Sequence, residues 1–149
     1  MNGEENMAAA EDQLSRLVME IQFLERTSEE LQARIGLVNA SINEFRLAHA
    51  TLEGMQMEDA DAQILVHIGG GSYVKAKIAD TQKLIMSIGA DVAAEKSVDM
   101  AKESLDTRLQ EFEKVRESLE QQLRQTQNRI STLRQQLQKM SQEVQKGQT

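Results

Sequence analysis

The chain has 149 residues, a length typical of a single domain, and it contains no cysteine, no proline and no tryptophan. The lack of cysteine excludes disulfides, thiol nucleophiles and thiolate metal sites, and a net charge of −7 argues against general nucleic-acid binding, since phosphate contacts need a basic surface. No apolar run approaches the roughly 18 to 20 residues of a membrane span, and the acidic N-terminus does not resemble a secretion signal, so we expect a helix-rich cytoplasmic protein without membrane contact.

An apolar heptad pattern runs from Leu14 to Leu52. Steps of three and four residues separate its twelve positions, of which all but Ser28 and His49 are apolar. The twelve positions are Leu14, Leu17, Ile21, Leu24, Ser28, Leu31, Ile35, Val38, Ile42, Phe45, His49 and Leu52. This repeat of 3.5 residues predicts a coiled-coil helix over about residues 8–53.

A second heptad pattern, equally regular, runs from Leu105 to Val144. All of its twelve positions except Arg116 and Thr126 are apolar. They are Leu105, Leu109, Phe112, Arg116, Leu119, Leu123, Thr126, Ile130, Leu133, Leu137, Met140 and Val144. We predict a second coiled-coil helix over about residues 98–146, which Ser97 or Asp99 caps and which ends close to Gly147.

Between the two heptad segments the spacing of the apolar residues changes. Gly54 and the acidic segment 55–63 are expected to end the first helix. Apolar residues then alternate with others over about residues 64–96, in two units that are punctuated by Gly69–Gly71 and by Gly89. Because glycine permits the positive φ angles of a tight turn, we predict two consecutive β-hairpins here, with a turn at residues 80–82 between them.

The two hairpins are the predicted assembly surface. They have exposed edges and too little area to enclose a core, and such strands tend to add to strands of another chain. The residues expected to make these contacts are the apolar ones of the alternating pattern, Ile64, Val66, Ile68, Val74, Ile78, Leu84, Met86 and Ile88.

The predicted fold is mainly α with a small β insert. Because the insert is short, the second helix must return alongside the first, which makes a long antiparallel coiled coil with both termini at its far tip. The charges agree with this arrangement. Residues 1–30 hold eight acids and two arginines, a balance of −6, whereas residues 116–149 hold six bases and three acids, a balance of +3.

No group of residues predicts catalysis or cofactor binding. The segment GGGSYVK at 69–75 is rich in glycine, but a phosphate loop must open a helix and here strand residues follow. A hairpin turn is therefore the favoured interpretation, with a phosphate site as the alternative. His49 and His67 lie on different elements, whereas a metal site needs three or four convergent ligands. We expect no enzyme activity, no metal and no cofactor.

Apolar side chains near the tip are candidates for binding unfolded polypeptides. They are Met7, Leu14, Leu17, Val18, Leu133, Leu137, Met140 and Val144. If the helix ends splay, these side chains face solvent and form an adaptable apolar binding surface. If the ends stay together, the same side chains close the seam of the coiled coil.

The order of helix, two hairpins and helix, with IGGGSYVKAKIAD followed by SIGADVAAEKS, resembles the alpha class of the prefoldin family, of the archaeal type. The resemblance covers nearly the whole chain and is most specific over residues 65–105. The residues that match the family pattern there are Gly69, Gly71, Ser72, Lys75, Ser87, Gly89 and Glu95. His67 departs from the family, which often has proline before the Ile-Gly step.

The resemblance implies an ATP-independent co-chaperone, a hexamer of two alpha and four beta subunits. Its hairpins would assemble into an intersubunit β-barrel, and its tips would hold non-native chains and deliver them to a group II chaperonin. One alternative is a structural coiled-coil scaffold or spacer whose tips bind one defined folded partner. Another, the coiled-coil arm of an RNA-binding enzyme, is disfavoured by the charge of −7 and by the lack of a catalytic body.

Overall fold

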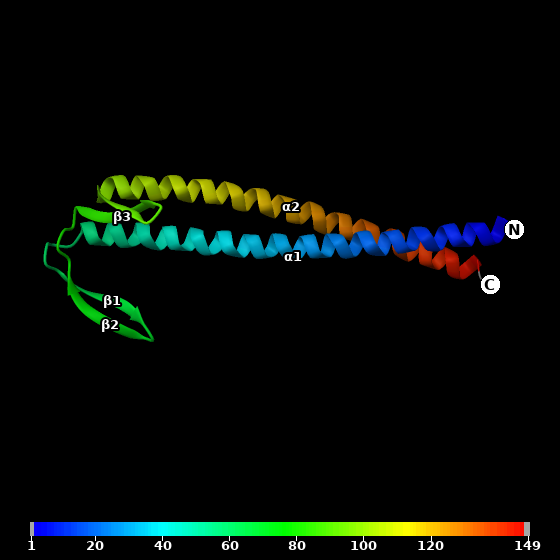
Figure 1. Cartoon of the computed structure of the whole chain (residues 1–149), viewed down its shortest axis with the longest axis horizontal. Coiled ribbons are helices and arrows are strands. Elements are labelled where there is room, and N and C mark those ends of the chain that lie inside the picture. Colours follow the sequence, from blue (N-terminus) through cyan, green and yellow to red (C-terminus); the bar gives the residue numbers. More distant parts are fainter. Residues whose placement is uncertain (1, 148–149) are drawn as a thin grey trace. The chain divides into compact units, whose positions relative to one another are not determined.

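The computed structural model describes residues 2–147 and contains two long helices with two β-hairpins between them (Figure 1). The elements are α1 (Asn2–Gln56), β1 (Gln63–Gly69), β2 (Ser72–Lys77), β3 (Lys83–Gly89), β4 (Val92–Ser97) and α2 (Val98–Gly147). The predicted order of helix, two hairpins and helix is confirmed. The contacts group into two compact units, unit 1 (Met1–Asn39 with Val115–Thr149) and unit 2 (Ala40–Lys114).

Helix α1 is longer at both ends than the heptad pattern predicts. It begins at Asn2 instead of near residue 8. The acidic side chains Glu4 and Glu5 in its first turn stabilise this start, because negative charge interacts favourably with the positive end of the helix dipole. The helix ends within the predicted segment, which comprises Gly54 and residues 55–63, but Gly54 itself does not stop it. A glycine costs only about 1 kcal/mol in a helix relative to alanine, so α1 continues to Gln56, where the Met57 amide bonds back to the Gly54 carbonyl at 3.2 Å.

Helix α2 begins with a side-chain cap. The Ser97 hydroxyl accepts a hydrogen bond from the Met100 amide at 3.2 Å, which satisfies one of the free amides of the first turn. Of the two predicted capping residues, Ser97 therefore has this role. The Val98 amide donates to the Gln82 carbonyl at 2.8 Å, so the start of α2 is also tied to the loop before β3.

The predicted seams are the buried faces of both helices. Within residues 2–147, none of the twelve heptad positions on α1 and none of the twelve on α2 is exposed. In unit 1 one buried cluster consists of Ile21, Ile130 and Leu133. In unit 2 another consists of Leu52, Val98, Ala101 and Leu105; Phe45 packs against it and lies edge to face with Phe112, with 5.2 Å between the ring centroids.

Polar contacts show that the two helices run in opposite directions in unit 1. Glu20 near the start of α1 pairs with Arg129 at 3.3 Å, whereas Asn39, further along α1, accepts from Arg116, which comes earlier on α2. Arg134 also contacts Glu25. The predicted proximity of the acidic N-terminal block and the basic C-terminal block is therefore confirmed.

The β segment forms two separate two-stranded sheets, β1–β2 and β3–β4. Both are antiparallel, and each has a bulge just before its turn. Asp80 makes the predicted turn between them, because its carboxylate accepts hydrogen bonds from the amides of Gln82 and Lys83, at 2.8 and 3.2 Å. Both hairpins belong to unit 2.

Candidate functional site

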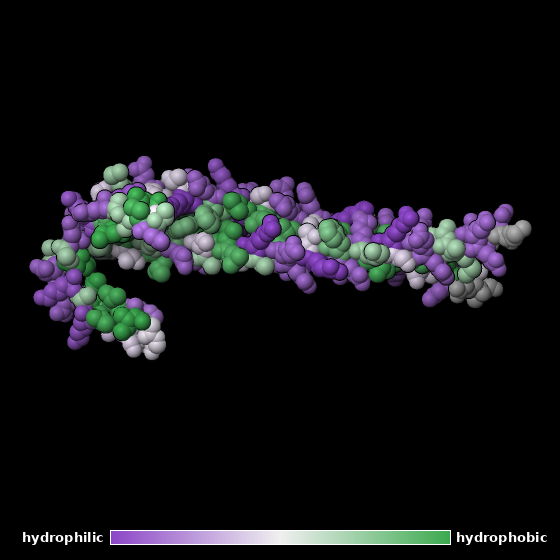
Figure 2. Space-filling view, in the orientation of Figure 1, coloured by the Kyte–Doolittle hydropathy of each residue, from purple (hydrophilic) through white to green (hydrophobic). Residues whose placement is uncertain are grey.

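The β1–β2 hairpin presents an apolar face that no part of its own unit covers. In the observed register Val66 lies opposite Val74 and Ile64 opposite Ala76, so the two predicted alternating sets meet on one face. Ile64, Val66 and Val74 are 38%, 42% and 46% exposed. Figure 2 shows this hairpin as a concentration of hydrophobic atoms at the surface. Exposed apolar area of this kind makes this face a candidate interaction surface.

The other predicted residues of this hairpin flank that face. Ile68, beside the bulge, is exposed, whereas Ile78 is half-buried. The Ile78 amide and carbonyl pair with Ala62 and Asp61, which extends the ladder beyond the two strands. Hydrogen bonding of Ile78 therefore holds the base of the hairpin.

The β3–β4 hairpin differs, because one of its faces packs on the helices of its own unit. Leu84 and Met86 contact the buried cluster around Leu52 and Val98. Ile85, on the opposite face, is 77% exposed, and Ile88 beside the bulge is also exposed. Of the three residues predicted for assembly in β3, only Ile88 is exposed in the single chain.

The helix termini of unit 1 form a small apolar groove. It has a volume of about 280 Å³ and is lined by Asn6, Met7, Ala10, Gln13, Met140, Glu143, Val144 and Gly147. Met7 is exposed, whereas Met140 and Val144 are half-buried. Three of the residues predicted to bind unfolded chains, Met7, Met140 and Val144, thus line one groove.

The remaining predicted tip residues are mostly in the closed seam. Leu133 is fully buried, and Leu17 and Leu137 pack against its cluster. Leu14 is half-buried, and Val18 is exposed. Of the two alternatives for the tip, closed or splayed, the structure therefore has the closed one over these residues.

Phe23 is an exposed apolar residue of unit 1 that the heptad pattern did not identify. It is 66% exposed, and Met19, one turn earlier on α1, is 69% exposed. Both lie outside the heptad positions that face α2. A large apolar residue at an outward position of an otherwise polar coiled coil is the sequence signal that could have found it.

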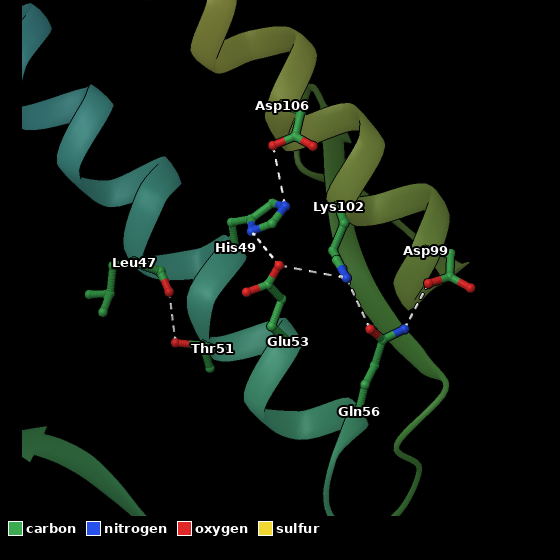
Figure 3. Close-up of polar contacts among 8 residues, drawn as sticks. All are labelled: Leu47, His49, Thr51, Glu53, Gln56, Asp99, Lys102 and Asp106. Atoms are coloured by element: carbon green, nitrogen blue, oxygen red, sulfur yellow. Dashed lines mark hydrogen bonds and ion pairs between the residues drawn. The ribbon is translucent and has the colours of Figure 1, made fainter.

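A polar network closes the end of the coiled coil in unit 2 (Figure 3). His49 lies between two carboxylates, 3.5 Å from Glu53 and 3.2 Å from Asp106. Lys102 donates to the Gln56 amide oxygen at 3.1 Å, and the amide nitrogen of Gln56 donates to Asp99 at 2.8 Å. His49 is thus a polar seam residue that joins the two helices, as its place in the heptad predicted.

The glycine-rich segment is a hairpin turn. Gly70 and Gly71 form its two-residue loop with φ angles of 59° and 73°, and strand β2 follows directly. The geometry favours the predicted turn over a phosphate loop, which would lead into a helix N-terminus. Within residues 2–147, no cluster of three or more His, Asp or Glu side chains could hold a metal ion, and no helix is long and apolar enough to cross a membrane.

Comparison with known proteins places these features in one family. A family model described as prefoldin subunit matches residues 24–143. The prefoldin subunit alpha of Methanopyrus kandleri is 35% identical over 78% of this chain and 74% of its own length. That of Thermococcus onnurineus is 39% identical over 71% of this chain and 73% of its own length.

A solved structure shares the fold. A chain in the cryo-EM structure of filamentous PFD from Methanocaldococcus jannaschii superimposes with a TM-score of 0.67 at 24% sequence identity, covering 77% of this chain and 95% of that chain. The family match spans both hairpins and most of both helices. The chain therefore belongs to the prefoldin family of non-enzymatic chaperones, in its alpha class.

Proposed function

We propose that the chain is a subunit of an ATP-independent co-chaperone, which holds non-native polypeptides at its helix termini and delivers them to a group II chaperonin. The observation that carries the proposal is the apolar groove of unit 1, where Met7, Met140 and Val144 meet at the ends of α1 and α2. Membership of the prefoldin family supports a chaperone role.

The groove suits weak and unspecific binding. Methionine side chains adapt to many shapes, and each apolar side chain contributes only about 1–3 kcal/mol when it is fully buried. A single tip would therefore hold an unfolded chain poorly, whereas several tips on one assembly would raise the effective affinity by multivalency. Val18, which is exposed, extends the candidate surface along α1, and Leu14, Leu17, Leu133 and Leu137 would join it if the seam opened.

Assembly through the hairpins would supply the several tips. We propose a hexamer of two alpha and four beta subunits, in which the hairpins join strands of neighbouring subunits into a β-barrel. The exposed face of Ile64, Val66 and Val74 supports this role for β1–β2. For β3–β4 the exposed residues Ile85 and Ile88 are the better candidates, because Leu84 and Met86 pack within their own chain.

A matched pair of triple variants tests the tip. Met7, Met140 and Val144 are changed to Asn in one variant, and Leu37, Leu47 and Met57, which are exposed outside the groove, are changed to Asn in the other. Suppression of aggregation is measured with two unrelated denatured proteins. Helical circular dichroism and native mass verify folding and assembly.

We expect the groove variant to lose suppression of aggregation for both denatured proteins, and the control variant to suppress aggregation nearly as well as wild type. Equal suppression by wild type and groove variant would contradict it. Retained binding of one client only would instead favour a scaffold with a defined partner.

A further inference from the structure

The groove at the helix termini of unit 1 contains one methionine from each helix. Met7 belongs to α1 and Met140 to α2, and Val144 supplies the third large apolar side chain of the lining. Two of these three side chains therefore carry a thioether. A thioether makes an apolar surface adaptable, and it is also the group of such a surface that mild oxidants attack.

Both thioethers lie where a small oxidant can reach them. Met7 is 37% exposed and Met140 is half-buried. The groove that they line has a volume of about 280 Å³, whereas a water molecule, which is slightly smaller than hydrogen peroxide, occupies about 30 Å³ of the liquid. Oxidation of this groove therefore does not need the helices to separate.

Oxidation would reverse the chemical character of the groove. A methionine sulfoxide is polar and accepts hydrogen bonds, whereas the thioether is apolar. An apolar side chain that packed against the sulfoxide would exclude water from its oxygen, and burial of an unpaired acceptor is unfavourable. Asn6 and Gln13 line the same groove and carry amide donors, so an oxidised groove can satisfy its sulfoxides without unfolding.

We propose that Met7 and Met140 are a modification site, at which oxidation by a peroxide lowers the affinity of the groove for non-native chains. The inference rests on the proposed function, since it concerns regulation of the same groove. In each oxidation the thioether sulfur attacks one oxygen of hydrogen peroxide. The S–O bond forms as the O–O bond breaks, the sulfur loses two electrons, and the other oxygen takes up the remaining proton and leaves as water. Methionine sulfoxide reductases reverse this step, with thiols as the reductant.

Other methionines allow the effect of this site to be separated from oxidation in general. Met57 is 88% exposed and Met100 is 61% exposed, so both should react at least as readily as Met7. Both belong to unit 2 and lie outside the groove. Total sulfoxide should therefore rise with positions 57 and 100, whereas binding of non-native chains should fall only as positions 7 and 140 react.

Two double variants with leucine test the site. Met7→Leu with Met140→Leu removes both thioethers from the groove and keeps the side chains apolar. Met57→Leu with Met100→Leu is the matched control in unit 2. Each assembled protein is treated with hydrogen peroxide, which catalase then removes, and its suppression of aggregation is compared with that of its own untreated sample. Peptide mass spectrometry measures the sulfoxide at each position.

We expect peroxide to raise the concentration needed for half-maximal suppression by roughly tenfold, in wild type and in M57L/M100L alike. M7L/M140L should change little. Methionine sulfoxide reductases with a thiol should restore oxidised wild type, and its helical circular dichroism and native mass should be the same before and after oxidation. Equal loss in wild type and M7L/M140L would overturn the inference, because other methionines such as Met55 or Met86 would then be responsible.

A time course with wild type gives a second reading that does not depend on the leucine variants. Loss of suppression should follow the appearance of sulfoxide at positions 7 and 140. Loss that follows positions 57 and 100 instead would overturn the inference, as would full suppression by protein that is oxidised at positions 7 and 140.

The variant with asparagine at positions 7, 140 and 144 separates this inference from the proposed function. If that variant suppresses aggregation like wild type, the groove does not bind non-native chains, and the inference fails with the proposed function. If that variant loses suppression but wild type oxidised at Met7 and Met140 keeps it, capture by the groove stands and regulation by oxidation is wrong.

Discussion

The imidazole of His49 on α1 contacts the carboxylate of Asp106 on α2, with 3.2 Å between Nε2 and Oδ1. One heptad further along α1, Gln56 bonds to Asp99, which is one heptad earlier on α2. The two contacts therefore report the same antiparallel register of the helices in unit 2. Polar seam residues of this kind are known to specify register in coiled coils.

His49 should contribute more to register than to stability. Its contacts with Glu53 and Asp106 involve carboxylates that are half exposed, and such pairs are worth about 0–1 kcal/mol each. We expect the free energy of unfolding of His49→Leu to be at least as large as that of wild type, because leucine fills a seam position with apolar atoms. His49→Ala, which leaves the position underfilled, should lose about 1 kcal/mol. Chemical denaturation compares them, and greater stability of H49A than of H49L would show that filling the seam is not what matters here.

The two hairpin turns should respond in opposite ways to exchange of glycine and alanine. Gly70 and Ala90 are equivalent residues with φ angles of 59° and 49°, a region that L-residues with a Cβ atom enter at a cost. We expect Gly70→Ala to destabilise β1–β2 by about 1 kcal/mol and Ala90→Gly to stabilise β3–β4 by about 0.5–1 kcal/mol.

Hydrogen exchange of the strand amides measures both effects locally. A Cβ atom added at Gly70 would meet no atom within 4 Å, so any loss comes from the backbone alone. Faster exchange in β3–β4 of the A90G variant would contradict the account of the turn.

Activity should need neither nucleotide nor divalent metal. The glycine-rich loop around Gly70 and Gly71 leads into strand β2, so its amides are not aimed at an anion by a helix N-terminus. Suppression of aggregation in EDTA, after removal of nucleotide, should equal suppression with magnesium and ATP. A strict dependence on ATP would require a binding site that the described residues do not suggest.

The sequence predicted the seam well because the heptad repeat is a local property of the chain. Every predicted seam position, Ser28 and Arg116 included, lies on the covered side of its helix. Periodicity could not separate the two hairpins, since Val66 and Met86 occupy the same place in the same alternating pattern. Only tertiary packing makes Met86 a contact of the helices and leaves Val66 exposed.

The candidate tip was harder to predict for a related reason. A heptad identifies which side chains face the partner helix, but closure of the seam decides which of them reach solvent. Leu133 is therefore buried although it belongs to the predicted set, whereas Phe23, outside the heptad, is exposed. Exposure at the end of a coiled coil depends on how far the seam stays closed, which the repeat itself does not encode.

The most direct test of the account is the place at which a non-native chain touches the protein. A photo-cross-linking amino acid is introduced in the assembled protein at Met7 in the groove of unit 1, and, as control, at Leu47, an apolar residue of unit 2 that is 69% exposed. After illumination with a denatured client, cross-links from position 7 and few from position 47 are expected. Equal labelling at both positions, or labelling at position 47 alone, would contradict capture at the helix termini.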